Sequence, residues 1–105
     1  MSKRGDTIVI QADYVQCSIF IDIESVIWST EDIDKLFEVI WNYSIHKESV
    51  ELEIVSSGKN KPTKQWIYWV SNMELLASLS LELVEKVKRE LPHKDVQLSD
   101  LNKYD

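Results

Sequence analysis

The chain has 105 residues, of which 44% are hydrophobic and 29% charged, and its formal net charge at pH 7 is -6. This length fits one domain, and the apolar fraction argues against a disordered chain. Two glycines, two prolines and one cysteine exclude a collagen-like chain, a Gly-rich nucleotide loop, an internal disulfide and a zinc site built from several cysteines. We expect a single domain over residues 1–105, with a flexible N-terminus (1–5) and a polar C-terminal tail (92–105).

Two strand patterns open the chain. Residues 7–11 are a short apolar run, and residues 14–24 alternate with a period of two, which is typical of a half-buried strand. Residues 12 and 13 between them predict a tight hairpin. The side of the second strand opposite its isoleucines includes Phe20, Asp22 and Glu24.

A helix is predicted next. Ser29 and Asp32 have the spacing of a capping box, in which short polar side chains satisfy the free N–H groups of a first helical turn. Apolar residues then recur at helical spacing and predict one buried stripe. The stripe comprises Ile33, Leu36, Phe37, Ile40 and Trp41. Asp34 and Glu38 lie away from it.

The second half of the chain repeats this pattern. Residues 50–56 alternate, with Glu51 and Glu53 on one side, and residues 57–63 form a turn rich in Gly, Asn and Pro. Residues 64–70 return as a strand. Ser71 and Glu74 predict the start of a second helix, which ends before Pro92 because proline cannot continue it. The second half of the chain is therefore predicted to form a strand, a turn, a strand and a helix.

The predicted order is β-β-α-β-β-α, which places the chain in the α+β class. Each hairpin carries one helix, and each helix has one apolar face to bury. The simplest solution is a four-stranded sheet with both helices packed on one face. The other face of the sheet is then left without a helical cover.

The acidic residues concentrate in the first half of the chain. Residues 6–56 hold eleven of the eighteen carboxylates and only two basic residues. Clustered like charge costs some stability but attracts a partner of opposite sign. Nucleic acids are poor partners for such a surface, whereas a basic protein is a good one. The carboxylates expected on the uncovered face are Asp22, Glu24, Glu51 and Glu53, followed by Asp34 and Glu38 on the first helix.

Four Trp and four Tyr are a high aromatic content for this length. On the strand at residues 64–70, either Trp66 and Tyr68 or Ile67 and Trp69 must point away from the core, because side chains alternate. We expect Trp66 and Tyr68 to share the uncovered face with Phe20. Aromatic rings beside carboxylates are good anchors for a Lys- and Arg-rich partner.

No catalytic motif stands out in the sequence. The four sheet carboxylates could hold Mg²⁺ or Ca²⁺, but alternating acids of this kind are more often a solvated sheet face. We therefore expect no metal, no cofactor and no enzymatic activity. No run approaches the length of a membrane-spanning helix and no signal peptide is recognisable, so we expect a cytoplasmic protein without a membrane partner.

In size, acidity and aromatic content the chain resembles small acidic bacterial inhibitors such as nuclease immunity proteins and antitoxins. This resemblance implies a protein that neutralises a basic, nuclease-type toxin by masking its active site. Two alternatives stay open: a regulatory or structural subunit that dimerises through the uncovered sheet face, and a phage-type inhibitor of a DNA-binding enzyme. The chain could be a monomer or a homodimer. The expected partner-binding residues are Asp22, Glu24, Glu51, Glu53, Phe20, Trp66 and Tyr68, with Asp34 and Glu38 second.

Overall fold

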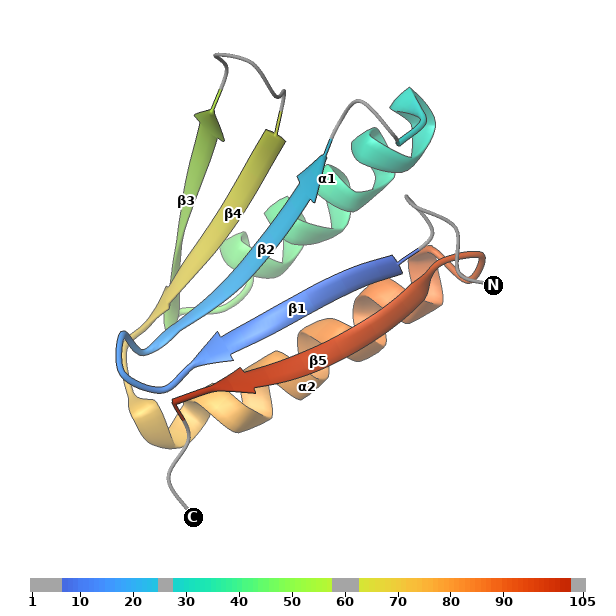
Figure 1. Ribbon diagram of the computed structural model, residues 1–105. Helices are drawn as coiled ribbons and strands as arrows, with labels where there is room; N and C mark the ends of the chain where they lie inside the picture. Colours follow the sequence, from blue (N-terminus) through green and yellow to red (C-terminus); the bar gives the residue numbers. More distant parts are fainter. Residues whose placement is uncertain (1–6, 25–27, 58–62, 103–105) are drawn as a thin grey trace.

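The chain folds as one α+β domain with both helices on one face of a mixed sheet (Figure 1). The computed structural model describes residues 7–24, 28–57 and 63–102. The elements in chain order are β1 (Thr7–Asp13), β2 (Ser18–Glu24), α1 (Thr30–Ile45), β3 (Val50–Ser57), β4 (Thr63–Val70), α2 (Met73–Glu90) and β5 (Asp95–Leu101). No helix in these ranges is long and apolar enough to cross a bilayer.

The sheet has five strands in the order β3-β4-β2-β1-β5, so the expectation of four strands is wrong. β4 pairs antiparallel with both β2 and β3 and thereby joins the two hairpins. The fifth strand, β5, comes from the segment expected to be a polar tail, and it pairs parallel to β1. Val96 is buried and Leu98 is partly buried beneath α2, so two apolar residues and a free strand edge suffice to order this segment.

The turn between β1 and β2 occupies residues 14–17, later than expected. The Asp13 carboxylate accepts hydrogen bonds from the backbone N–H groups of Val15 (3.0 Å) and Gln16 (3.2 Å), which stabilises a tight turn directly after β1. Cys17 closes the turn with φ of 57°, a left-handed conformation that costs a non-glycine residue roughly 1–2 kcal/mol. The alternation through Val15 therefore continues into a turn and not into a strand.

Both helices begin at side-chain caps. The Ser29 side chain accepts from the N–H of Asp32 at 3.2 Å, which confirms the predicted start of α1. The cap of α2 is Asn72 and not Ser71, and the Asn72 side chain accepts from the N–H of Glu74 at 2.8 Å. The two helices run antiparallel, because Lys35 near the start of α1 pairs with Glu90 at the end of α2.

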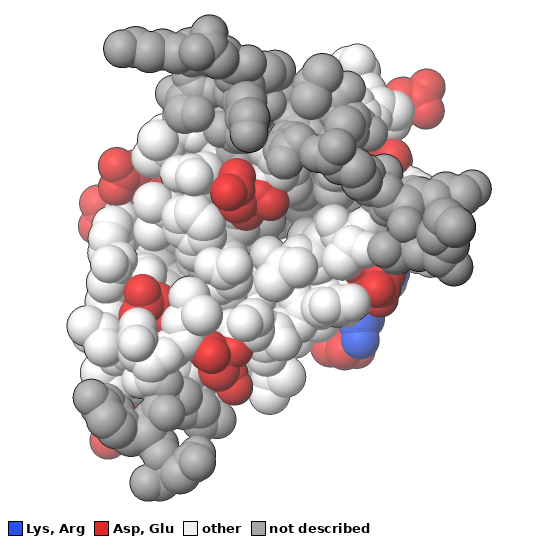
Figure 2. Space-filling view, viewed as in Figure 1, with Lys and Arg blue, Asp and Glu red and all other residues white. Residues whose placement is uncertain are grey.

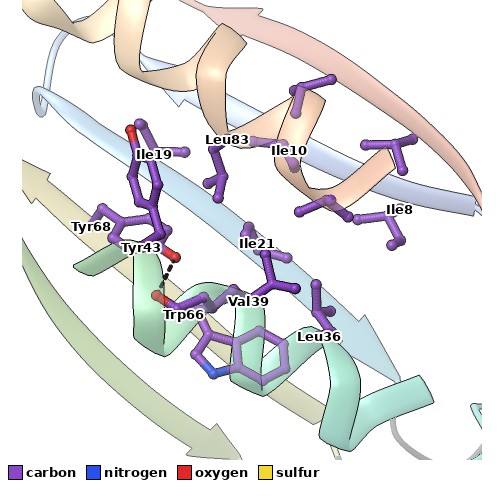
Figure 3. Close-up of a cluster of buried hydrophobic side chains, with 14 of the residues drawn as sticks. Ile8, Ile10, Ile19, Ile21, Leu36, Val39, Tyr43, Trp66, Tyr68 and Leu83 are labelled. Carbon is purple, nitrogen blue, oxygen red and sulfur yellow. Dashed lines mark hydrogen bonds between the residues drawn. The ribbon is translucent and has the colours of Figure 1, made fainter. Parts of the chain in front are cut away.

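The core lies between the helices and the sheet (Figure 3). The Tyr68 hydroxyl donates to the carbonyl of Ile40 at 3.0 Å, and the Tyr43 hydroxyl donates to the carbonyl of Leu79 at 2.9 Å. The two tyrosine rings pack edge to face with centroids 5.4 Å apart. Polar atoms of these large side chains thus find backbone partners inside an otherwise apolar layer.

The buried stripe of α1 differs from the prediction. The helix buries Leu36, Val39, Ile40 and Tyr43. Phe37 and Trp41 are exposed by 38% and 48%, and their rings stack on each other. Leu36 and Ile40 are buried as predicted, but Val39 and Tyr43 take the places expected for Phe37 and Trp41. The helix α1 is apolar on two sides, and the sequence alone does not say which side meets the sheet.

Candidate functional site: the open face of the sheet

The face of the sheet away from the helices, called here the open face, carries the candidate site. Residues paired across the ladders lie on the same face, so the register identifies its members. Its members on the three strands β2, β3 and β4 include Phe20, Asp22, Glu51, Glu53, Ile67 and Trp69. Figure 2 shows this face, where acidic groups are spaced over a broad uncharged surface and blue appears only at the rim.

Trp69 is at the centre of the contacts on this face. Glu51 is its direct cross-strand partner on β3. The indole Nε1 of Trp69 donates to Oε2 of Glu53 at 3.0 Å, which fixes the ring beside the two carboxylates. The side chain of Trp69 is still 38% exposed. A large apolar surface is therefore held in a defined orientation and remains available for contact.

Two half-buried apolar side chains continue this surface toward the middle of the sheet. Phe20 on β2 stands directly opposite Ile67 on β4. Neither is covered by a helix, since α1 and α2 pack on the other face (Figure 1). Phe20, Ile67 and Trp69 together give the open face an apolar centre, with carboxylates beside it.

The charged side chains described on the strands of the open face are all carboxylates. Besides Asp22, Glu51 and Glu53, this face holds Asp13 at the first turn and Asp95 on β5. β4 separates β2 from β3, so Asp22 is not on a strand adjacent to Glu51 and Glu53. This spacing reduces the repulsion that adjacent acidic strands would suffer. It also spreads negative potential over the whole face, which suits a partner with dispersed positive charge.

The expectation that Trp66 and Tyr68 lie on the open face is wrong. Both are 0% exposed and face the helices (Figure 3), where Tyr68 is hydrogen-bonded to α1. The cause is the phase of β4, because Trp66 and Tyr68 share their side of the strand with the buried Val70. Neither residue can touch a partner on the folded protein.

The remaining predicted contact residues are divided between locations. Asp34 and Glu38 are exposed on α1, and the helix lies on the opposite side of the sheet from the open face. One flat partner surface therefore cannot cover them together with Asp22, Glu51 and Glu53. Glu24 ends β2 in register with Thr63, and its side chain lies outside the described residues.

The prediction missed Ile67 and Trp69. Ile67 and Trp69 share one side of the strand with Thr63 and Gln65. Polar residues mark the solvent side of a strand, so these two residues could have pointed to the open face. The opposite phase also contains a charged residue, Lys64, so the two phases were nearly balanced by polarity. Only packing against α1 decides between them.

A second polar cluster joins α1 to the loop before β5. Oδ1 of Asp32 lies 2.7 Å from Nε2 of His93, and Oδ2 lies 3.3 Å from Nζ of Lys94. The Lys94 ammonium also lies 4.4 Å from the centroid of the buried Trp28 ring. Partial burial opposes ionisation of Asp32, but hydrogen bonds from His93, Lys94 and Ser29 outweigh it and lower the pKa of this carboxyl below its usual value. Both carboxylate oxygens are used in holding two elements together, which is a structural role.

A groove of about 440 Å³ lies between the two helices. The ion pairs Lys35–Glu90 (3.1 Å) and Lys47–Glu82 (2.7 Å) connect α1 and α2 near it. The lining carries both signs of charge, and it is on the helical side of the domain. Within the described ranges, no group of three or more His, Cys, Asp or Glu side chains is arranged to hold a metal ion.

Comparison with known proteins finds distant structural likeness and no sequence match. No protein-family model and no curated protein matches the sequence. Two solved structures are distantly similar. SMU.848 from Streptococcus mutans is 7% identical with a TM-score of 0.46, over 90% of this chain and 92% of that one. The ribosomal processing protease Prp from S. aureus, solved with a covalently linked product peptide, is 13% identical with a TM-score of 0.44, over 90% and 97%. At these scores the likeness carries no argument about this chain.

Proposed function

We propose that this chain is a protein-binding inhibitor of the immunity-protein or antitoxin type, which neutralises a basic, nuclease-type toxin by covering its active site. The observation that supports this most is the open face, where every charged side chain described on the strands is acidic and an oriented tryptophan stands among them. A face of this kind is complementary to a surface built to hold nucleic acid.

The proposed mechanism uses two kinds of contact. Asp22, Glu51 and Glu53 occupy the places that substrate phosphates would take against Lys and Arg side chains of the toxin. Trp69 and Phe20 supply the apolar anchors that keep the complex together once it has formed, because large aromatic side chains dominate interface energetics. The carboxylates would chiefly raise the association rate, and the aromatic residues would chiefly slow dissociation.

The test is binding to a basic, nuclease-type toxin domain, measured as a function of salt. The association rate should fall steeply as ionic strength rises. Glu51→Lys should slow association by about tenfold and flatten its salt dependence. Glu85→Lys makes the same charge change on α2, where the side chain is exposed, and is the matched control that should leave association nearly unchanged. Equal effects of the two variants would contradict the proposed face.

A homodimer through the open face is the second candidate, and the apolar centre of that face favours it. Its carboxylates disfavour it, because two copies of one face would bring like charges together. Sedimentation at low and high salt separates the two ideas. A dimer that strengthens with salt and is abolished by Trp69→Glu would replace the inhibitor proposal.

A further inference from the structure

β3 is an edge strand with one side free. It pairs with β4 along its whole length without a bulge, from Val50 opposite Val70 to Ser57 opposite Thr63. No other described strand pairs with it, and Figure 1 shows it projecting past the helices at the border of the sheet. Long, regular edges of this kind are templates for adding another strand.

The hydrogen-bond pattern shows which backbone groups of β3 point outward. The N–H of Ser71 donates to the carbonyl of Ser49 at 3.0 Å, so this pair belongs to the hydrogen-bonded class of the ladder. The same class recurs at every second residue, which assigns Glu51 and Glu53 to bonds with β4. Leu52 and Ile54 therefore direct their N–H and C=O groups away from the sheet.

The two sides of the β3 edge differ in chemistry. Glu51 and Glu53 are exposed on the open face. Leu52 and Ile54 lie on the helix side, opposite Tyr68 and Trp66. Although Trp66 is fully buried, Ile54 is 43% exposed, so the helical layer stops short of the edge.

The flank of α1 toward β3 extends this apolar side. The flank of α1 that faces α2 carries Glu38 and Asn42, which line the groove between the helices. At about 100° per residue, Phe37 and Trp41 lie on the other side of the buried stripe from Asn42, and so on the flank away from α2. They are exposed and stacked at 6.3 Å between ring centroids. We call the apolar set Leu52, Ile54, Phe37 and Trp41 the β3 shelf.

A buried polar atom lies next to this shelf. Trp66, the cross-strand neighbour of Ile54, buries its indole N–H, and this donor has no hydrogen-bond partner among the described residues. Figure 3 shows the nitrogen on the edge of the ring farther from Leu36. A buried donor left unpaired costs about 1–3 kcal/mol, so the domain carries a small energetic penalty beside this edge.

We infer that β3 accepts an extended segment of a basic protein as a sixth strand, in which Lys or Arg alternates with large apolar residues. The outward groups of Leu52 and Ile54 bond the backbone of that segment. Its cationic side chains lie beside Glu51 and Glu53, and its apolar side chains cover the β3 shelf. The period of two in a strand delivers both kinds of side chain to the correct side at once. This inference rests in part on the proposed function, because it specifies how a basic partner is held.

A second copy of the chain is a poor occupant of the same edge. Pairing of two β3 strands would place Glu51 and Glu53 of both copies on one face, and like charges on neighbouring strands are destabilising. The same carboxylates therefore discourage self-association and select a cationic strand.

The experiment uses the intact chain and a short peptide that alternates Lys with Val. Calorimetric titration should show binding, and the amide protons of Leu52 and Ile54 should gain protection from hydrogen exchange. An otherwise identical peptide methylated at every second amide nitrogen should lose at least about tenfold in affinity, because it cannot form the backbone ladder. A peptide that alternates Glu with Val should not bind. No binding, or binding indifferent to N-methylation, would overturn strand addition.

Ile54→Pro provides the matching change in the protein. The N–H of Ile54 points outward, so proline removes an edge donor without removing a bond to β4. Ile54→Pro should lower the affinity for the Lys–Val peptide by at least about tenfold. Ile54→Thr keeps the N–H and should lower this affinity less. A melting temperature for each variant shows that the fold is retained. The N-methylated peptide makes the test independent of either substitution.

Failure of this inference and failure of the proposed function give different results. Asp22→Lys changes the middle of the open face, whereas Ile54→Pro changes only the edge. If Asp22→Lys abolishes binding of the basic domain but Ile54→Pro does not, strand addition is wrong and the inhibitor proposal stands. If the peptide adds to β3 but no basic domain binds, strand addition stands and the inhibitor proposal fails.

Discussion

Two tryptophans on β4, three residues apart, meet opposite environments. Trp66 is fully buried under α1, whereas Trp69 is partly exposed and bonded to Glu53. Both sit in a strand whose two phases look alike by composition, so a single residue step decides which ring is core and which is surface. The buried phase is secured by Tyr68, whose hydroxyl reaches the backbone of α1.

Tyr68→Phe should reduce the free energy of unfolding by about 1 kcal/mol at neutral pH, because it deletes one buried hydrogen bond. Burial raises the pKa of Tyr68 above its usual 10.0, so the folded state favours the neutral hydroxyl. The stability that this preference provides is complete below pH 10 and is lost as pH rises further. Urea titrations of both proteins from pH 7 to 11 measure this. A variant as stable as the parent at pH 7 would show that the bond contributes nothing.

At the scale of elements, the sequence predicts features set by neighbouring residues, such as helix caps, and misses features set by contacts between distant segments. The start of α1 at Ser29 is set by a cap within one turn, and the sequence identified it. The buried side of α1 depends on which surface packs against it, so Phe37 and Trp41 were misplaced. β5 was missed because its burial requires the edge of β1, which lies far away in the chain. Asp22, Glu51 and Glu53 lie on the open face as expected, whereas Trp69 was expected to face the core.

Val96→Ala should lower the free energy of unfolding by about 1–3 kcal/mol, because it deletes buried methyl groups from a packed strand. Gln97→Ala, on the exposed side of the same strand, should change it by less than about 0.5 kcal/mol. Chemical denaturation compares the two. Identical effects would mean that β5 adds nothing to the stability of the domain.

Asp32→Asn should destabilise the protein at neutral pH, because it removes the negative charge and one of the two acceptor oxygens that bind His93 and Lys94. Since the pKa of Asp32 is lowered on folding from 3.8, its contribution is complete above that value and is lost as pH falls through the folded pKa. The difference between parent and variant should therefore shrink below about pH 4. Thermal melts from pH 7 to 2.5 test it, with the exposed Asp34→Asn as control. A difference that persists unchanged at pH 2.5 would contradict the assignment.

At the scale of the whole molecule, one layer of helices and one sheet enclose a continuous core. The core side of β4 joins both helices, and β4 also bridges the two hairpins. Local unfolding of any one of these elements therefore exposes apolar residues of another. The acidic side chains of the open face and Trp69 lie outside this core.

Calorimetric unfolding should show one transition with equal calorimetric and van't Hoff enthalpies, because a single core unfolds at once. A chain of 105 residues should give a heat-capacity increase of about 1.3–1.6 kcal/mol/K. Two resolved transitions would mean that the β3–β4 hairpin and the remaining strands unfold separately.

The parallel pairing of β5 with β1 has a consequence for biosynthesis. Among the described elements, β1 is synthesised first and β5 last. The edge of β1 that pairs with β5 therefore stays unpaired until the rest of the domain has been made. The two hairpins can form during translation, but the five-stranded sheet is complete only when β5 has left the ribosome. We therefore expect slow translation of the segment before β5 to prolong the time in which the edge of β1 is exposed to aggregation.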